Sequence, residues 1–310
     1  MLEVLSGFTV MAEFVFFVAV GYIGKKTGYL GKNALDGCME LILKIGVPGS
    51  ILSSAASVSL TAETMANAGW TLLIYTLCFC ISAVVTKPLG AAFRIPASRR
   101  RCFEGVISFK NISFMGFPLC VAVLGRESLF YAALCTVVFN LTNWSYGVYL
   151  YSGVHKIQWK KIFCNSAMIS SFLLVILIIA GIQPSGIVQD TLEAAGNLCT
   201  PLPLIVVGIM LADVKFSRLF TDWQMYLISV LSLVVFPALT CLVIWLFGVP
   251  AGPARVLILL SATPAATMNA VMAKNYGGDE EFVSLAILQN MFLCLFTIPV
   301  VYIVAQQLFF

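Results

Sequence analysis

Apolar residues form long, nearly unbroken runs along the whole chain, separated by short stretches rich in Gly, Pro and charge. Runs of roughly 20 apolar residues are typical of α-helices that cross a bilayer. The pattern predicts ten spans, numbered in chain order, at residues 4–23, 34–55, 68–92, 103–124, 128–151, 162–182, 189–212, 224–247, 254–274 and 281–306. The expected fold class is an all-α integral membrane protein with ten transmembrane helices and short loops.

Composition agrees with this pattern, because 60% of the 310 residues are hydrophobic and only 10% are charged. A soluble domain needs more polar surface to cover its core. The first apolar run follows Met1–Leu5, which carries Glu3 but no Lys or Arg. A signal peptide begins with a positive region, so we expect a retained helix here.

Basic residues favour one side of the predicted membrane. Fourteen of the 18 Lys and Arg lie in or beside the odd-numbered loops, while Arg126 and Arg255 lie on the other side. The positive-inside rule then places the odd-numbered loops in the cytoplasm and both termini outside it. We therefore expect a multi-pass protein of the plasma (inner) membrane.

Five spans per half imply that a duplicated second copy would insert upside down. Short similarities support a duplication at 1–155 and 156–310: Gly125–Phe130 resembles Gly277–Phe282, and spans 2 and 7 both carry mid-span prolines. Two inverted five-helix repeats are a common plan of secondary transporters.

Spans 4 and 9 each place a proline among polar and small residues. Backbone groups freed by such a break must find partners within the protein or a cavity. We expect two discontinuous helices that cross, with their half-helix ends facing a substrate; the alternative is ordinary kinks with small residues for close packing. The prolines are Pro118 and Pro264, and the candidate binding residues are Lys110, Asn111, Ser113, Asn140, Thr263, Pro264, Asn269 and Asn290.

Ionisable residues inside spans are expensive and need a partner or a cavity. Lys110 suits an anionic substrate such as a carboxylate, although snorkelling or a structural pair with Glu104 or Glu13 would also explain it. Glu13 and Lys44 are expected to form a charge pair, either structural or proton-coupling.

Neither a metal site nor an enzyme is indicated. The ten cysteines contain no C-x-x-C pair, the one histidine is His155, and no G-x-S-x-G is present. We expect no cofactor, no metal and no nucleic-acid partner.

The residues of span 4 resemble a known family. Asn111-Ile-Ser-Phe-Met-Gly-Phe-Pro-Leu119 is similar to the N-x-x-x-M-G-x-P-L stretch of the auxin efflux carrier family, which includes plant PIN carriers and bacterial organic-acid carriers. Pro264 with the later Ala273-Lys274, Val47-Pro48, and Gly208–Ala212 fit the same family.

The resemblance implies a scaffold of spans 1, 2, 6 and 7, often the homodimer contact, and a transport domain of spans 3–5 and 8–10 that moves like an elevator. By position, Asn111 matches the family's substrate-contacting Asn, and Pro264 matches the first crossover proline of span 9.

Two departures from the plant carriers bear on the substrate. Lys110 and Asn269 stand where those carriers have prolines, which makes the crossing more polar and more cationic. This favours a small carboxylate such as malate or malonate over indole-acetate. Two other readings remain open: a sodium-coupled symporter resembling bile-acid carriers, which would want acidic residues beside the crossing, and a non-transporting membrane sensor.

Overall fold

The computed structural model describes residues 2–31, 33–58, 61–153, 158–199, 201–213 and 219–309. Within these ranges every regular element is a helix, apart from one isolated β-bridge. The predicted all-α fold is confirmed. Four basic residues of the odd-numbered loops and the one histidine lie outside the described ranges: Lys32, His155, Lys156, Lys215 and Arg218.

The first half of the chain folds into helices that follow the first five predicted spans. In chain order these are α1 (Leu2–Lys26), α2 (Ala34–Leu41), η1 (Ile42–Gly46), α3 (Val47–Ser53), η2 (Ser54–Ser57), α4 (Ala62–Ala92), α5 (Ala97–Ser108), η3 (Ile112–Gly116), α6 (Phe117–Leu124), α7 (Ser128–Thr142), η4 (Asn143–Gly147) and α8 (Val148–Ser152).

The second half continues in the same way. Its helices are α9 (Trp159–Phe163), α10 (Ser166–Ile179), α11 (Gly186–Gly196), η5 (Asn197–Cys199), α12 (Pro201–Asp213), α13 (Trp223–Val230), η7 (Leu231–Val235), α14 (Phe236–Phe247), α15 (Ala251–Ser261), α16 (Met268–Tyr276) and α17 (Glu280–Phe309). In the described part of the chain, five continuous runs are long and apolar enough to cross a membrane: Ala34–Ser57, Ala62–Ala92, Gly186–Asp213, Trp223–Phe247 and Glu280–Phe309. The count of ten crossings stays a prediction.

Three prolines each follow a π-helical turn at the same spacing. Pro48, Pro118 and Pro237 are the second residues after η1, η3 and η7. Proline lacks the N–H that an α-helix uses, and its ring collides with the carbonyl four residues earlier. A wider π turn accommodates this loss, and such turns often lie at functional sites. The prolines therefore set where these helices depart from regular geometry.

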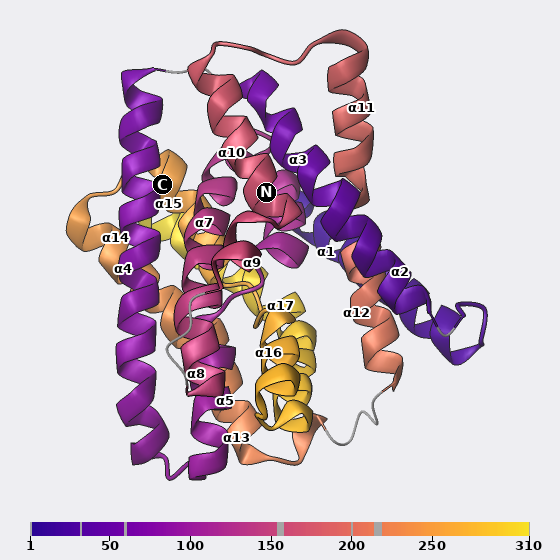
Figure 1. Ribbon diagram of the computed structural model, residues 1–310, viewed down its shortest axis with the longest axis vertical. Coiled ribbons are helices and arrows are strands. Elements are labelled where there is room, and N and C mark those ends of the chain that lie inside the picture. Colours follow the sequence, from indigo (N-terminus) through magenta and orange to yellow (C-terminus); the bar gives the residue numbers. More distant parts are fainter. Residues whose placement is uncertain are drawn as a thin grey trace.

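The helices pack in two groups (Figure 1). The first packing group holds α1, α2, α3, α10, α11 and α12. The second packing group holds α4 to α8 with α13 to α17. Contacts between the groups run mainly from α7 to α10 and to α3, and from α17 to α1 and α12. In Figure 1, α4 runs vertically on the left side, and α2 and α12 lie at the right.

Helices α1 and α12 meet backbone to backbone. A Cβ added to Gly21 would lie 2.1 Å from the carbonyl oxygen of Ile205, and one added to Gly208 would lie 2.0 Å from that of Val18. Small residues allow membrane helices to approach this closely and to gain packing energy. The contact between α1 and α12 therefore depends on both glycines.

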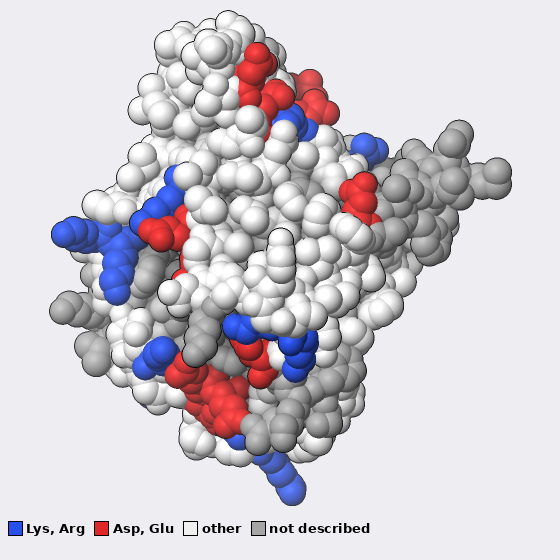
Figure 2. Space-filling view, turned by 90° about the vertical axis from the view of Figure 1, so that its right-hand side faces the viewer, with Lys and Arg blue, Asp and Glu red and all other residues white. Residues whose placement is uncertain are grey.

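Much of the molecular surface is apolar. Along α10, Ile169, Phe172, Ile176 and Ile179 are 54%, 45%, 60% and 65% exposed. On the face drawn in Figure 2, charged side chains gather in a few patches and leave broad areas without charge. Soluble monomers rarely expose apolar areas of this extent, so these faces suit lipid contact.

The structure does not pair Glu13 with Lys44, contrary to the expectation from the sequence. The Lys44 ammonium pairs with Glu40, one helical turn earlier on the same run, and both side chains are more than half exposed. Glu13 is exposed on α1. Residues four apart on one helix face are immediate neighbours, so Glu40 reaches Lys44 without any contact between helices.

Adding a methyl group at the α1–α12 contact should destabilise the fold. Gly208→Ala would place its Cβ 2.0 Å from the Val18 carbonyl oxygen, which is too close for two non-bonded atoms. The helices must then separate, which should lower the free energy of unfolding by about 3 kcal/mol. Gly69→Ala is the matched control, because none of the described atoms lies within 4 Å of its added Cβ. Thermal unfolding in detergent should show a clear loss for Gly208→Ala alone. Equal melting temperatures for the two variants would disprove the close contact.

Candidate functional site

Two helices break and cross in the interior of the second packing group. Helix α5 ends at Ser108, and the chain is extended from Phe109. Helix α15 ends at Ser261, and the chain makes one further turn at Ala262 before it reaches the crossing at Ala265. The two extended segments lie antiparallel, with a bridge between Lys110 and Ala265. Asn111 N–H donates to the Pro264 carbonyl and Ala266 N–H donates to the Phe109 carbonyl, both at 2.8 Å. Each break therefore pairs the backbone groups of the other, as a dry interior requires.

Local sequence explains why the chain breaks here. Pro264 has no N–H, and proline disfavours helical geometry in the residue before it. On the other segment, Asn111 begins η3 as a cap, with its Oδ1 accepting the Phe114 N–H at 3.2 Å. Asn side chains are preferred at such positions. Both breaks are encoded by residues that stop or start a helix.

Asn269 holds the crossing together from the α16 side. Its amide nitrogen donates to the carbonyls of Ala266 at 3.0 Å and Phe109 at 3.3 Å. Its amide oxygen accepts the Tyr151 hydroxyl at 3.1 Å. With these partners, Asn269 links the crossing to α8. Thr263 is likewise engaged locally, donating to the Leu260 carbonyl at 2.6 Å.

Asn111 also brings an unused donor to the crossing. Its side chain is 2% exposed, and its Nδ2 has no hydrogen-bond partner among the described residues. The N-terminal ends of η3 and α16 begin at the same crossing and carry partial positive charge. A buried N–H group left without an acceptor costs about 1–3 kcal/mol. A ligand oxygen would satisfy this donor.

Asn290 is a second buried amide without partners. It is 0% exposed in the middle of α17, and within the described chain neither its Nδ2 nor its Oδ1 makes a hydrogen bond. Helix α17 packs against α5, α15 and η7, the elements that surround the crossing. The amide can therefore donate from its Nδ2 and accept at its Oδ1 when a molecule or water is bound beside it.

Lys110 points away from this donor. Adjacent residues of an extended segment face opposite sides, and the Lys110 ammonium donates to the carbonyl and to the hydroxyl of Ser232 in η7, both at 2.6 Å. The side chain also lines a cavity of about 50 Å³. Ser232 is not a residue that the sequence pattern singles out, because only the folding of α13 and α14 brings it to the crossing.

Two other predicted residues have different surroundings. Asn140 donates to the Thr136 carbonyl at 2.9 Å, and its Oδ1 accepts the Asn165 amide at 3.3 Å. It thus joins α7 to the start of α10, the interhelical role that polar residues often have in membranes. Ser113 is half-buried in η3, two residues after Asn111. The structure brings Lys110, Asn111, Thr263, Pro264 and Asn269 together and leaves Asn140 at the seam between the packing groups.

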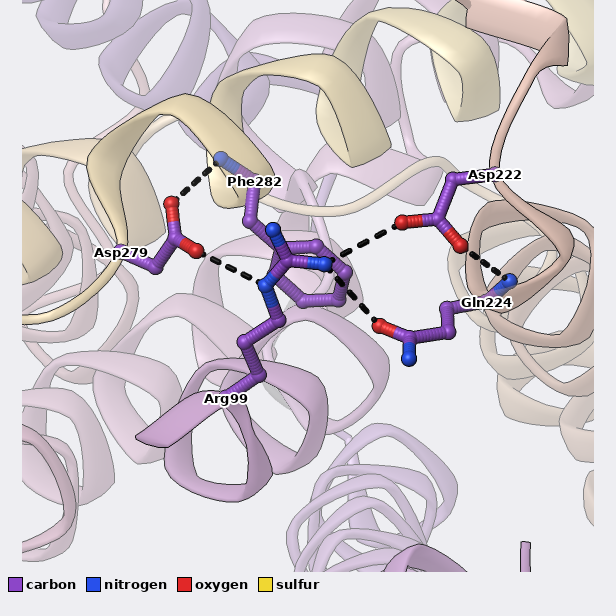
Figure 3. A network of polar contacts seen from close by, with 5 residues as sticks. All are labelled: Arg99, Asp222, Gln224, Asp279 and Phe282. Atoms are coloured by element: carbon purple, nitrogen blue, oxygen red, sulfur yellow. Dashed lines mark hydrogen bonds and ion pairs between the residues drawn. The ribbon is translucent and has the colours of Figure 1, made fainter. Parts of the chain in front are cut away.

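A polar network ties three helix starts together at one end of the second group (Figure 3). Arg99 donates from Nε to Asp279 at 2.8 Å and from one terminal nitrogen to Asp222 at 3.2 Å and Gln224 at 3.3 Å. Its guanidinium lies 4.8 Å from the centre of the Phe282 ring. Asp222 caps α13 and Asp279 caps the first turn of α17. Arg99 therefore couples the starts of α5, α13 and α17.

An all-α, largely apolar chain with crossed half-helices in its interior has the architecture of an integral membrane transporter. A family model described as "Membrane transport protein" matches the chain twice, over residues 6–156 and 151–302. The chain belongs to this family of membrane transport proteins, which agrees with the resemblance seen in span 4. Membership in a transporter family also fits the expectation that the protein is not an enzyme.

Two archaeal proteins are similar over nearly the whole chain. An "Uncharacterized transporter" of Methanothermobacter thermautotrophicus is 24% identical over 302 residues, covering 94% of this chain and 95% of that protein. "Uncharacterized transporter MJ1031" of Methanocaldococcus jannaschii is 21% identical over 278 residues, covering 87% and 89%. Both comparisons support a membrane transporter.

Removing the Arg99 network should loosen the second packing group. Arg99→Ala leaves the two capping carboxylates without their shared cation, and because these groups are about one-third exposed we expect a loss of about 1 kcal/mol. Arg100→Ala is the control, since Arg100 donates only to the Ile95 carbonyl in the described contacts. Thermal unfolding of the two purified variants makes the comparison. A stability for Arg99→Ala equal to that of Arg100→Ala would contradict the coupling role.

Proposed function

We propose that this protein is a secondary transporter of a small organic anion, a carboxylate of the malate or malonate class, bound at the crossing of spans 4 and 9. The observation that carries the proposal is the buried Asn111 amide, which among the described residues has a donor without a partner where two helix N-termini begin. Carboxylate oxygens accept hydrogen bonds from such donors and are favoured by the positive ends of helices.

The neighbouring residues support an anion. Lys110 adds the one cationic side chain that the extended segments contribute, next in sequence to Asn111. Asn290 adds an amide that can donate to a second oxygen. The residues proposed to contact the substrate are therefore Asn111 and Asn290, with Lys110 contributing charge from the opposite side of the extended segment.

An elevator-type movement is supported by how the helices pack. The crossing lies wholly within the group of α4 to α8 and α13 to α17, so this group could carry the site as one body. The other group, which contains the glycine contact of α1 with α12, would be the scaffold, formed by spans 1, 2, 6 and 7. The double match of the family model supports two repeats near 1–155 and 156–310.

Orientation and assembly are part of the same proposal. The Arg99 end of the transport group would face the cytoplasm, since the basic loops lie there by the positive-inside rule. Both termini would then lie outside the cytoplasm of a plasma (inner) membrane. A homodimer through the scaffold helices would bury part of the exposed apolar face of α10.

Uptake of labelled malonate and malate into proteoliposomes tests the function. We expect Asn111→Ala and Asn290→Ala each to lower uptake about tenfold, which corresponds to about 1.4 kcal/mol of lost binding. Asn275→Ala is the control, because Asn275 is exposed on α16 away from the crossing. Thermal unfolding should confirm that all three variants are folded.

Other outcomes separate the alternatives. Wild-type protein that takes up neither anion, or variants that transport normally, would disprove the proposed site. Uptake that requires sodium would favour a symporter of the bile-acid-carrier type. Binding of a carboxylate without flux would favour a non-transporting sensor.

A further inference from the structure

The ammonium of Lys110 is buried without a counter-ion. The side chain is 8% exposed, and its hydrogen bonds go to two neutral oxygens of Ser232. Among the described residues, no carboxylate lies within ion-pair distance of its Nζ. A charged group in the membrane interior is costly when nothing offsets its charge, and it faces a partner or a functional pathway. A purely structural lysine would be expected to have a carboxylate beside it.

Ser232 can hold the Lys110 nitrogen in either protonation state. The ammonium form donates to both the carbonyl and the hydroxyl oxygen of Ser232. The neutral amine donates to the carbonyl and accepts the hydroxyl proton, because a serine hydroxyl can rotate to donate or accept. A proton can therefore leave or arrive without breaking either contact.

The groups that surround Lys110 are neutral at ordinary pH. Helix α4 presents Tyr75, Cys78 and Ser82, α14 presents Thr240, and α15 presents Ser261 to the cavity that Lys110 lines. Helix α17 contributes Gln289 and Asn290, α8 contributes Tyr151, and α16 contributes Asn269, all packed on or near α5. Tyr and Cys side chains ordinarily keep their protons near neutral pH.

Four charged groups on or beside these elements have contacts that lead away from Lys110. Glu104, on α5 itself, accepts the Tyr146 hydroxyl, and the Lys87 ammonium lies over that same Tyr146 ring. Lys274 of α16 is largely exposed and reaches Glu280. Asp222, before α13, pairs with Arg99. None of these pairs offsets the charge of Lys110.

A small cavity that contains a few hydroxyl-bearing residues gives the proton a place to move. The cavity of about 50 Å³ beside Lys110 is lined mainly by apolar side chains, together with the polar residues Ser82, Ser108, Thr240 and Ser261. The hydroxyls of Thr240 and Ser261 donate to carbonyls of their own helices, and their oxygens can still accept a hydrogen bond from water. A water needs only about 10–15 Å³ of such space and two or more polar partners. The Ser82 hydroxyl donates to that of Ser108 at 2.9 Å, so part of a hydrogen-bonded chain is already formed.

We propose that Lys110 couples anion transport to a proton: its amine gains a proton when the anion binds at the crossing and loses it when the anion leaves, so that each anion crosses together with one proton. The inference rests on the proposed anion site at Asn111. Lys110 and Asn111 are adjacent residues, with Cα atoms about 3.8 Å apart, and charges inside a dry interior are screened much less than charges in water. A carboxylate at Asn111 and the Lys110 charge on the other side of the segment therefore still attract each other. Each charge then favours binding of the other, and this coupling is reciprocal.

The first test uses the wild-type protein alone. Malonate binding is measured by calorimetry at several pH values above neutrality, where both carboxylates of malonate stay ionised. We expect the dissociation constant to rise by up to tenfold per pH unit as Lys110 loses its proton. In proteoliposomes with a trapped pH dye, inward malonate flux should acidify the lumen. Affinity that is independent of pH, or malonate uptake without acidification, would overturn the coupling.

The second test changes the amine. Lys110→Arg keeps a permanent positive charge, so malonate should still bind but with affinity that no longer varies with pH, and uptake should no longer acidify the lumen. Lys110→Gln removes the charge, and its binding should be weak and also independent of pH. Variants that fold and retain the wild-type pH dependence and acidification would assign the proton to another group and overturn the role of Lys110.

The outcomes also separate this inference from the proposed function. If the wild type takes up no carboxylate at any pH, the transport proposal fails and the coupling fails with it. If malonate uptake is lost in Asn111→Ala but never carries a proton in the wild type, the site stands and only the coupling is overturned.

Discussion

The structure depends on one constraint: a backbone that leaves helical geometry inside an apolar bundle must find hydrogen-bond partners within the protein. Here each broken helix supplies those partners for the other, through the carbonyls of Phe109 and Pro264. Because the backbone is satisfied in this way, side chains at the break are not needed as caps for every orphan group. The Asn111 amide nitrogen can therefore remain available.

Two cations of the second packing group, Arg99 at one end and Lys110 at the crossing, have contrasting surroundings. Near the end of the helices, Arg99 is shared by two carboxylates and lies against an aromatic ring. At the crossing, Lys110 has only neutral oxygens as described partners. The first arrangement stabilises a charge permanently, whereas the second makes the charge dependent on what else is bound. This difference separates a structural cation from one suited to function.

Sequence patterns located the breaks but not all the contacts around them. Proline, Asn and hydroxyl residues have local effects on the backbone, so Pro264, Asn111 and Asn269 could be assigned to a crossing from the sequence alone. The direction of Lys110 could not, because it depends on the register of two segments more than 150 residues apart. Ser232 and the Arg99 network were missed for the same reason, since their partners come from distant parts of the chain.

The bridge between Lys110 and Ala265 spans very few residues, and this has a consequence for how the protein can diverge. Substitutions elsewhere on the half-helices change size or polarity at single points. An insertion or deletion of one residue beside the bridge would instead exchange the sides occupied by Lys110 and Asn111, because side chains alternate along extended backbone. Related sequences can therefore carry substitutions near the crossing, but an insertion or deletion beside the bridge would disrupt the site.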